Sequence, residues 1–371
     1  WRTSKLAEAD LGGCTESRQD EVVKNSNDSK YYYCDKLFWR TATVLEYDTY
    51  QWAAGKNGEM KTGSVVETNY YVYDGKAWRS ATSTETTLKA SCVTDSLGVY
   101  HAKKYVCDAS GWRTANTMEN NLNTGCVTAT EGITATYNEI DLTCKGGKWA
   151  ANVTYGTLTD ERDGHTYKTV TIGTQTWMAE NLNYRYVGVG YKYSSYEDDS
   201  TSWCYNGTKS NCDTYGRLYT WSAAMDSAAQ FTENEGTKCG YGATCTPNTP
   251  HRGICPEGWH VPTNAEYSTL YTTIGGTDYA GIYLKSTDKW YENSSSEPGI
   301  DLYGFSVLPA GYRRNDGYFD NQGLSAYLWS ASEDYSYSAY NQYFYGDYAG
   351  VYQDFNSKDN GFSLRCLQDS N

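Results

Sequence analysis

The sequence lacks any run of about 18 apolar residues, and it therefore predicts no membrane-spanning helix. Positive charge is also scarce: 31 Lys and Arg stand against 45 Asp and Glu, which gives a formal net charge of −14. An acidic chain is repelled by phosphate backbones and by anionic lipid surfaces, so neither nucleic acid nor a membrane surface is an expected partner. No Cys-x-x-Cys pair occurs and the four His are scattered, so no metal cluster and no cofactor is expected.

Cysteine and aromatic residues, in contrast, are abundant. Twelve Cys in so polar a chain predict disulfides and an oxidising compartment. The 38 Tyr and 12 Trp combine apolar area with a polar group, which suits half-exposed sheets and binding surfaces. The chain begins at Trp1 without Met or a signal peptide, so we expect a mature or trimmed protein, or part of a longer one, with any lipid anchor outside this chain.

Residues 1–155 contain a short motif that repeats with a period of about 34 to 39 residues. Its clearest copies end in Trp-Arg-Thr-Ala or Trp-Arg-Ser-Ala, and Trp1-Arg2-Thr3 resembles the tail of a further copy. Strand-like residues and Asp-Gly or Gly-Gly turns predict a β-hairpin or a three-stranded meander in each copy. Units this small need a crosslink or a packed neighbour. The copies are residues 33–42, 72–81, 106–115 and 142–151.

The distribution of cysteines predicts how those of the repeats pair. The first, third and fourth copies carry two Cys each, whereas none lies between Cys34 and Cys92 in the second copy. Both sites are missing together, as bridging within a repeat requires, because the loss of one partner alone would leave a stray thiol. We therefore predict bonds within repeats, each covered by the Trp of its own repeat. The predicted pairs are Cys14–Cys34, Cys92–Cys107 and Cys126–Cys144.

Residues 157–371 form the second predicted domain. Alternating residues at 163–178 predict two strands joined by a tight turn, and residues 215–225 predict a short amphipathic helix. Thr263-Asn264-Ala265-Glu266 is a capping box, so a helix should begin there and run to about Ile274. The fold class is therefore α+β, mostly β and loop. Short strands are predicted at residues 305–308, 311–313, 327–332, 340–345, 350–355 and 361–366.

Six further cysteines lie in this domain. Cys204 and Cys212 could pin a long loop, and Cys239 and Cys245 are close in sequence. A bond between Cys255 and Cys366 would close more than a hundred residues into one loop. The chain-entropy model gives about 4 to 5 kcal/mol for such a crosslink. With all six paired, no reactive thiol would be left for oxidase chemistry.

Six motifs follow one another in this domain. They are residues 171–184 (Thr-Ile-Gly-Thr-Gln-Thr-Trp-Met-Ala-Glu-Asn-Leu-Asn-Tyr), 215–221 (Tyr-Gly-Arg-Leu-Tyr-Thr-Trp), 255–263 (Cys-Pro-Glu-Gly-Trp-His-Val-Pro-Thr), 304–311 (Gly-Phe-Ser-Val-Leu-Pro-Ala-Gly), 329–332 (Trp-Ser-Ala-Ser) and 361–366 (Gly-Phe-Ser-Leu-Arg-Cys). Over roughly residues 157–369 the sequence resembles the Fibrobacter succinogenes major paralogous domain family, FISUMP, and the Cys and Trp-Arg repeats are similar to those of its members. The resemblance implies a bacterial surface or secreted protein, commonly lipid-anchored at the outer membrane, with no established activity.

The order of a capped helix and three short strands is also similar to the C-type-lectin-like fold, within it to the formylglycine-generating branch. This similarity implies a C-type-lectin-like C-terminal domain preceded by small disulfide-stapled β repeats. The calcium-dependent sugar site of C-type lectins is incomplete here, because Glu297-Pro298-Gly299 lacks the Asn and no Trp-Asn-Asp occurs. The sequence leaves open whether a calcium ion is bound.

An aromatic surface on the C-terminal strands and loops is the best candidate for a binding site. Aromatic faces stack on sugar rings while neighbouring amides and acids bond the hydroxyls. No catalytic residue is expected, since no Ser-His-Asp constellation is evident. The candidate ligand-binding residues are Tyr312, Arg313, Asn315, Asp316, Tyr318, Trp329, Tyr335, Tyr343 and Tyr345.

Together these observations predict a non-enzymatic, extracellular protein of the bacterial cell surface, associated with the outer membrane. Its repeats would form a stalk that presents a lectin-like domain to a polysaccharide of the plant cell wall type or to a partner protein. The alternative is a structural subunit of a surface assembly or filament with homotypic contacts, and a carbohydrate-active enzyme is a third possibility. N-glycosylation sequons occur at Asn27, Asn152, Asn206 and Asn293, although a chain this rich in Ser, Thr and Asn contains a few by chance.

Overall fold

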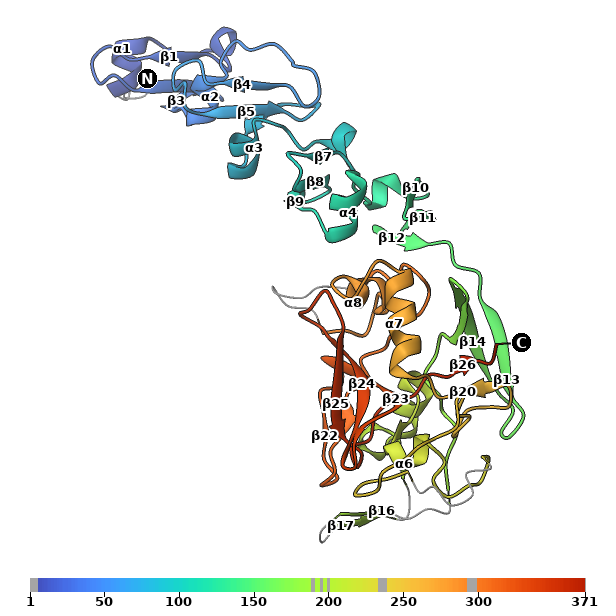
Figure 1. The fold of residues 1–371 in the computed structure, drawn as a ribbon. Helices are drawn as coiled ribbons and strands as arrows, with labels where there is room; N and C mark the ends of the chain where they lie inside the picture. The colour runs from blue at the N-terminus through green and yellow to red at the C-terminus, as the bar shows by residue number, and fades with distance from the viewer. Residues whose placement is uncertain are drawn as a thin grey trace. The chain divides into compact units, whose positions relative to one another are not determined.

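The computed structural model describes residues 6–187, 191–193, 196–198, 201–232, 239–291 and 299–370. They form a mostly β protein with short helices, and the predicted α+β class is confirmed (Figure 1). Contacts divide the chain into two compact units, Trp1–Tyr137 with Thr143–Trp149, and Asn138–Leu142 with Ala150–Asn371. Trp1-Arg2-Thr3, Asn293 and Glu297-Pro298 lie outside the described residues. The other three sequon residues, Asn27, Asn152 and Asn206, are exposed.

Each repeat folds as a three-stranded meander preceded by a short helix, which confirms the predicted hairpin-like units. The helices are α1 (Leu6–Leu11), α2 (Val44–Asp48), α3 (Ser83–Leu88) and α4 (Thr117–Leu122), and the 3-10 turns are η1 (Glu16–Arg18), η2 (Thr94–Ser96) and η3 (Thr128–Thr130). The strands are β1 (Val22–Lys24), β2 (Tyr31–Asp35), β3 (Phe38–Thr41), β4 (Met60–Thr62), β5 (Tyr70–Tyr73), β6 (Trp78–Ser80), β7 (Tyr100–His101), β8 (Tyr105–Asp108), β9 (Gly111–Thr114), β10 (Thr134–Tyr137), β11 (Ile140–Lys145) and β12 (Lys148–Ala151).

The disulfides of the repeats join the partners that the sequence predicts. Cys14–Cys34, Cys92–Cys107 and Cys126–Cys144 each close a loop of 15 to 20 residues within one repeat. In the first repeat Trp39 packs on its own disulfide, as expected. Each bridge therefore supplies the core that a sheet of this size cannot build from apolar side chains alone.

An ion pair connects each of the first three sheets to the helix that follows it. The Arg of the Trp-Arg motif binds the Glu of the next helix's capping box, as in Arg79–Glu85 at 2.8 Å. Oε1 of Glu85, the oxygen that forms this pair, also accepts the backbone N–H of Cys92 at 3.0 Å. Burial alone would raise the pKa of Glu85, but the bonds from Arg79 and from backbone N–H groups lower it to about 2. The same pairs recur as Arg40–Glu46 and Arg113–Glu119.

The second repeat has neither cysteine, and its structure shows what stands in their place. In the other three repeats, the indole N–H of the Trp donates to the carbonyl of the residue two positions before the first Cys. In the second repeat Trp78 donates to Ala53, which puts Gly55 at the site of the first Cys. Tyr73 occupies the site of the second Cys, because its carbonyl accepts the same bond from Gly58 that Cys107 accepts from Gly98. A glycine beside a tyrosine thus replaces the disulfide.

We predict that the double variant Gly55→Cys/Tyr73→Cys forms a disulfide. A Cβ atom on Gly55 would lie 3.0 Å from Cβ of Tyr73, so a shift of about half an ångström reaches the spacing of a normal bridge. The side chains of Glu59 and Trp78, 2.7 and 2.9 Å from that Cβ, must move aside. The 18-residue loop should add about 3 kcal/mol to the unfolding free energy of the oxidised double variant relative to Gly55→Ser/Tyr73→Ser, which cannot form the bond. Mass spectrometry detects the bond, and urea unfolding of both oxidised proteins measures the difference while the six native disulfides stay intact. Equal stability of the two variants would contradict it.

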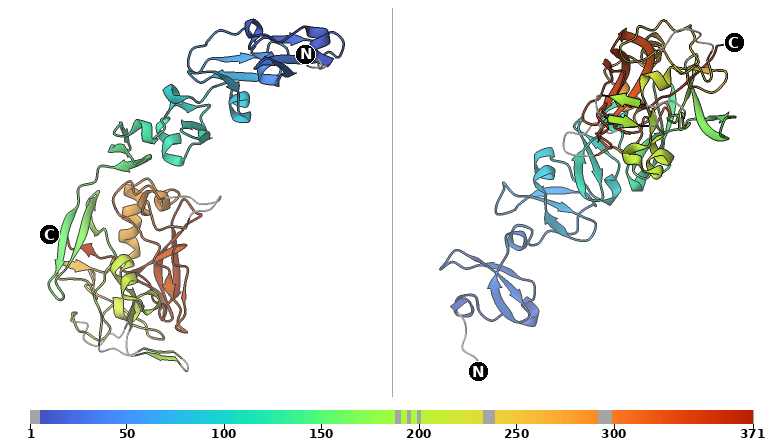
Figure 2. Two further views of the ribbon diagram at one scale, coloured as in Figure 1. Left: turned by 180° about the vertical axis from the view of Figure 1, so that it is seen from behind. Right: turned by 90° about the horizontal axis from the view of Figure 1, so that it is seen from below.

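The two largest sheets of the C-terminal unit have a helix between them (Figure 1). The five-stranded sheet has the order β13-β14-β15-β26-β20, and the second sheet has the order β23-β24-β25. Helix α7 (Asn264–Thr273) lies between them, and Figure 2 shows the same arrangement from behind. The strands are β13 (Gly156–Asp160), β14 (His165–Ile172), β15 (Gln175–Met178), β20 (Trp259–His260), β23 (Ser325–Tyr335), β24 (Ser338–Tyr345), β25 (Tyr352–Ser357) and β26 (Leu367–Gln368).

Smaller elements surround these sheets. The remaining strands are β16 (Tyr191–Tyr193), β17 (Tyr196–Asp198), β18 (Ser202–Trp203), β19 (Leu218–Tyr219), β21 (Tyr312–Arg313) and β22 (Phe319–Asp320). The remaining helices are η4 (Tyr205–Gly207), α5 (Lys209–Tyr215), α6 (Trp221–Ala224) and α8 (Ala280–Leu284). The other three disulfides, Cys204–Cys212, Cys239–Cys245 and Cys255–Cys366, also join the predicted partners.

The predicted capped helix is confirmed, whereas the predicted helix at 215–225 is wrong. Thr263 and Glu266 form the reciprocal capping box of α7, and Ile274 ends it. At the other segment Gly216 has φ +74° and lies against the backbone of Asn181 and Leu182, so it ends α5 and starts a turn. Leu218 and Tyr219 then pair as β19 with β18. Within 215–225 only Tyr215, the last residue of α5, and the four residues of α6 are helical.

Two of the predicted strands are not regular strands. In segment 305–308 only Val307 forms an isolated bridge, and Phe305 is buried. Segment 361–366 forms isolated bridges at its first three residues, and β26 begins only at Leu367. In segment 305–308 the reason is Arg365, which is fully buried and donates to the carbonyls of Phe305 and Ser306. A side-chain cation thus satisfies backbone groups that a strand partner would otherwise bind.

Candidate functional site

Two of the predicted ligand-binding residues lie in the interior. Trp329 is completely buried, and its indole N–H donates to the carbonyl of Tyr219 at 2.8 Å. Arg313 is also completely buried, with its guanidinium 3.8 Å from the ring centroid of Trp203. Since neither side chain reaches solvent, both stabilise the fold and cannot contribute to the predicted surface. The sequence could not separate them from their exposed neighbours.

Three tyrosines stand in one row across the last sheet. Tyr327 pairs with Tyr343, and Tyr343 pairs with Tyr352, in the antiparallel registers of β23, β24 and β25. Their rings stack at centroid distances of 4.7 and 6.0 Å, and Tyr348 continues the stack from Tyr352 at 4.5 Å. Burial and the neighbouring Tyr327 hydroxyl raise the pKa of Tyr343. We call Tyr327, Tyr343, Tyr348 and Tyr352 the tyrosine ladder.

The tyrosine ladder brings some of the predicted residues together, but the faces of its rings are covered by neighbouring rings. Tyr312 contacts Tyr327 at 5.0 Å, and Tyr345 lies 6.1 Å from Tyr343, so both flank the ladder. Rings that stack on each other at interplanar angles of about 20° present edges and hydroxyls outward, and their faces are occupied. The ladder is therefore less suited to stacking on sugars than separate exposed rings are.

The predicted residues Asn315, Asp316 and Tyr318 lie in the turn between β21 and β22. Tyr318 is 70% exposed, the largest exposed fraction among the described large apolar and aromatic side chains. Asp316 accepts a hydrogen bond from Arg314 at 2.7 Å, and Asn315 is half-buried. This turn therefore presents one tyrosine beside an ion pair.

The β23–β24 hairpin carries a second group of exposed rings. Tyr335 and Tyr337 stand at its turn, and Tyr241 from the Cys239–Cys245 loop contacts Tyr337 at 4.8 Å. Their exposed fractions are 66%, 49% and 50%, respectively. The rings are tilted by 50° and 58°, so they do not cover one another's faces. We call Tyr241, Tyr335 and Tyr337 the aromatic tip, and only Tyr335 belongs to the predicted site.

The base of the aromatic tip is tied together by hydrogen bonds from three segments. The N–H of Gly242 donates to the carbonyl of Ser336 at 2.9 Å, and the N–H of Cys245 donates to Glu333 at 3.1 Å. Lys358 is buried, forms an ion pair with Glu333, and donates to the carbonyl of Ala243 at 2.9 Å. The disulfide loop is thus held on the hairpin, which keeps the three rings in a fixed arrangement.

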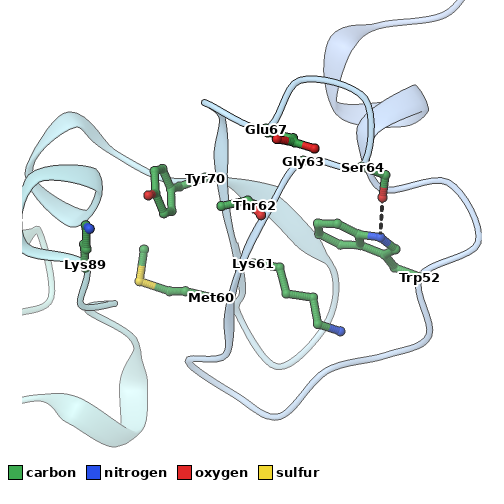
Figure 3. Close-up of a pocket in the computed structure, with 9 residues that line it drawn as sticks. All are labelled: Trp52, Met60, Lys61, Thr62, Gly63, Ser64, Glu67, Tyr70 and Lys89. Atoms are coloured by element: carbon green, nitrogen blue, oxygen red, sulfur yellow. Dashed lines mark hydrogen bonds between the residues drawn. The ribbon is translucent and has the colours of Figure 1, made fainter.

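The second repeat contains an open groove around the edge of strand β4 (Figure 3). Met60, Tyr70 and Lys89 lie on one side of the strand, and Trp52 and Lys61 lie on the other. The indole N–H of Trp52 donates to Ser64 Oγ at 2.8 Å, which fixes the ring. The groove is lined by the continuous backbone segment from Met60 to Ser64.

A buried histidine joins the last strand to the start of helix α7. Nδ1 of His260 lies 2.6 Å from Asp369, and Nε2 lies 3.0 Å from Glu266. Burial would lower the pKa of His260, but the bonds with both carboxylates outweigh it and raise the pKa above 6.5. Burial would likewise raise the pKa of Glu266, but its bonds with His260 and Thr263 lower it below 4.5.

We predict that this clamp stabilises the C-terminal unit most between pH 4.5 and 6.5. The contribution of His260 is complete below its unfolded pKa and is lost as the pH rises through its raised folded pKa. The contribution of Glu266 is complete above its unfolded pKa and is lost as the pH falls through its lowered one. Between pH 6 and pH 8 the clamp should contribute a fall in unfolding free energy, measured with urea, that Asp369→Asn diminishes and His165→Gln, at an exposed histidine, leaves intact. Burial lowers the pKa of His251, which adds a rise in stability that is common to all three proteins. An equal fall in Asp369→Asn would contradict this.

Within the ranges described above, no group of three or more His, Cys, Asp or Glu side chains could hold a metal ion. Among the helices in those ranges, none is long and apolar enough to cross a membrane. A family model, the Fibrobacter succinogenes major domain, matches residues 170–368. No curated protein and no solved structure matches the chain. The C-type-lectin-like architecture therefore stays a prediction.

Proposed function

Because the chain belongs to the Fibrobacter succinogenes major domain family, we propose that it is a non-enzymatic protein of the bacterial cell surface whose C-terminal unit binds polysaccharide. Family membership and the six disulfides support a surface-associated, extracellular protein, since disulfides persist in oxidising compartments. An association with the outer membrane belongs to the same proposal.

The geometry of the aromatic tip is the observation that carries the proposal. Tyr335, Tyr337 and Tyr241 are each about half exposed or more, and their faces do not cover one another. Open aromatic faces with adjacent hydrogen-bonding groups suit sugar rings, which have an apolar face and a rim of hydroxyls. Asp334 and Ser338 provide such groups next to the rings. A fixed arrangement also limits the entropy lost on binding.

Two observations favour binding over catalysis. All twelve cysteines form disulfides, so no thiol is available for oxidase chemistry of the formylglycine-generating kind. Burial raises the pKa of Asp301 to about 6, as a glycosidase acid would need, but both of its oxygens are occupied by the N–H and the hydroxyl of Ser306. Asp301 is therefore assigned a structural role.

A pull-down of the oxidised full chain on insoluble cellulose and xylan tests the proposal. We expect retention that is lost in Tyr335→Ala/Tyr337→Ala and kept in Tyr279→Ala, which removes a comparably exposed ring elsewhere. Tyr318→Ala alters the β21–β22 turn and Tyr352→Ala alters the tyrosine ladder. Both variants should be retained if the aromatic tip is the binding surface. Retention that survives in the tip variant would overturn the assignment of the site, and no retention on either polymer would overturn the proposed ligand.

A second candidate function, a subunit of a surface assembly, is favoured by strand β25. It lies at the edge of its sheet, and its first four residues, Tyr352–Phe355, are exposed. Among the described residues no strand pairs with its outer side. Exposed edges of this kind readily pair with another chain.

A further inference from the structure

We propose that strand β4 of one copy pairs with strand β25 of a second copy, so that copies join head to tail. This inference goes beyond polysaccharide binding and does not depend on it, because it uses neither the aromatic tip nor its ligand. It rests on the groove of the second repeat, on the hydrogen-bond pattern at two open sheet edges, and on the side chains that those edges carry.

The outward backbone groups of β4 belong to Met60 and Thr62. The N–H of Gly63 donates to the carbonyl of Asn69, and the N–H of Tyr73 donates to the carbonyl of Glu59. Glu59 and Gly63, which flank β4, therefore form their backbone bonds on the β5 side. Antiparallel pairing alternates along a strand, and Lys61 therefore also bonds toward β5. The N–H and C=O groups of Met60 and Thr62 consequently point away from the sheet into the groove.

The outward backbone groups of β25 follow from the same rule. The N–H of Lys358 donates to Tyr337 in the register that joins β25 to β24. Counting back by two residues, Asn356, Asp354 and Tyr352 bond toward β24. The N–H and C=O groups of Gln353 and Phe355 therefore face outward, along a strand whose residues 352–355 are exposed. The N–H of Phe355 donates to Oδ1 of Asp354 at 2.8 Å, so this bond must be exchanged for one to the partner strand.

One antiparallel register matches both edges in charge and in polarity. If Met60 faces Phe355 and Thr62 faces Gln353, the outward groups of both strands meet, and an apolar pair and a polar pair form. Lys61 then lies directly opposite Asp354, at a non-hydrogen-bonded position where side chains are closest. Lys61 and Asp354 are both exposed, and their present partners are local: Lys61 pairs with Glu59 at 3.1 Å, and Asp354 accepts the N–H of Phe355 at 2.8 Å. The contact between copies exchanges these partners for each other. Opposite charges placed across a strand pair stabilise it.

The walls of the groove suit a strand laid along β4. Trp52, fixed by Ser64, stands on the Lys61 side, and Tyr70 stands on the Met60 side (Figure 3). Pairing of an extended segment with an exposed edge gives affinity through backbone bonds and selectivity through alternate side chains. The two surfaces are different, so the contact is heterologous and each copy keeps one free edge. Such contacts build open chains of copies unless the rotation closes a ring.

Light scattering of the oxidised full chain over a range of concentrations tests this proposal. We expect the average mass to rise with concentration, and Lys61→Glu or Asp354→Lys to shift the rise to about tenfold higher concentration. The double variant Lys61→Glu/Asp354→Lys should restore assembly, because each exchanged charge meets the other across the contact. Circular dichroism and melting curves of every variant control for folding.

Edge-blocking variants test the backbone bonds themselves. Thr62→Pro removes an N–H that faces the groove and leaves the β4–β5 ladder intact, whereas Thr62→Val keeps that N–H. Thr62→Pro and Phe355→Pro should each remain monomeric, and their equimolar mixture should form dimers, since each retains one intact edge. A wild-type chain that stays monomeric at all concentrations, assembly that survives in either Pro variant, or a charge swap without rescue would overturn the proposal.

Discussion

The double variant Cys255→Ala/Cys366→Ala should lose about 5 kcal/mol of unfolding free energy. This bridge closes a loop of 111 residues, the longest of the six disulfide loops, and both cysteines are completely buried. The loss is a large part of the 5 to 15 kcal/mol that is typical of a domain. The crosslink also joins the segment that precedes α7 to the segment that carries Arg365, so its removal loosens both segments.

The variant Cys204→Ala/Cys212→Ala serves as the matched control. Its bridge spans only 8 residues, and the same entropy relation gives about 2.5 kcal/mol. Guanidinium unfolding of the full chain, followed by tryptophan fluorescence, measures both losses. Equal losses in the two variants would show that loop entropy does not govern the stability of this unit.

Trp329→Ala should cost about 3 to 5 kcal/mol, and any loss of ligand binding should come only from unfolding. The ring of Trp329 is completely buried, lies 4.3 Å from Phe362, and donates to the carbonyl of Tyr219. Removing it leaves a cavity in the interior, and the carbonyl of Tyr219 keeps only the bond from the N–H of Phe362. Melting curves compared with Tyr335→Ala, where an exposed ring should change stability by only about 0.5 kcal/mol, measure the difference. A stable Trp329→Ala protein that fails to bind would contradict this assignment.

Local and repeated features of this chain could be predicted from its sequence. The bonds within repeats followed from the joint loss of both cysteines in the second copy. The start of α7 followed from Thr263 and Glu266, whose side chains and backbones satisfy each other within four residues. Both inferences use information that lies within one short segment or within a comparison of copies.

Features that depend on contacts distant in sequence could not be predicted. The helix predicted at 215–225 fails because Gly216 packs against Asn181 and Leu182, more than thirty residues earlier. The same limit applies to the site. An aromatic-rich sequence does not show that Trp329 points inward, that Tyr343 is stacked on both sides, or that Tyr241 reaches the hairpin of Tyr335 from a different loop.

The strand pairing proposed for β4 and β25 and the polysaccharide binding proposed for the aromatic tip use separate surfaces. A surface protein with both would carry its ligand site on copies that are linked into a chain, which multiplies weak contacts with a polymer. The variants above separate the two, because Thr62→Pro leaves the aromatic tip unchanged and Tyr335→Ala/Tyr337→Ala leaves both edges unchanged.

A depletion isotherm of the full chain on crystalline cellulose tests the central claim most directly. The series compares the wild type with Tyr335→Phe/Tyr337→Phe, which keeps the ring faces, and with Tyr335→Ala/Tyr337→Ala, which removes them. We predict that the Phe variant binds within about threefold of the wild type and that the Ala variant loses binding by at least about tenfold, since stacking on open ring faces carries the affinity. Equal binding by all three proteins would contradict the claim.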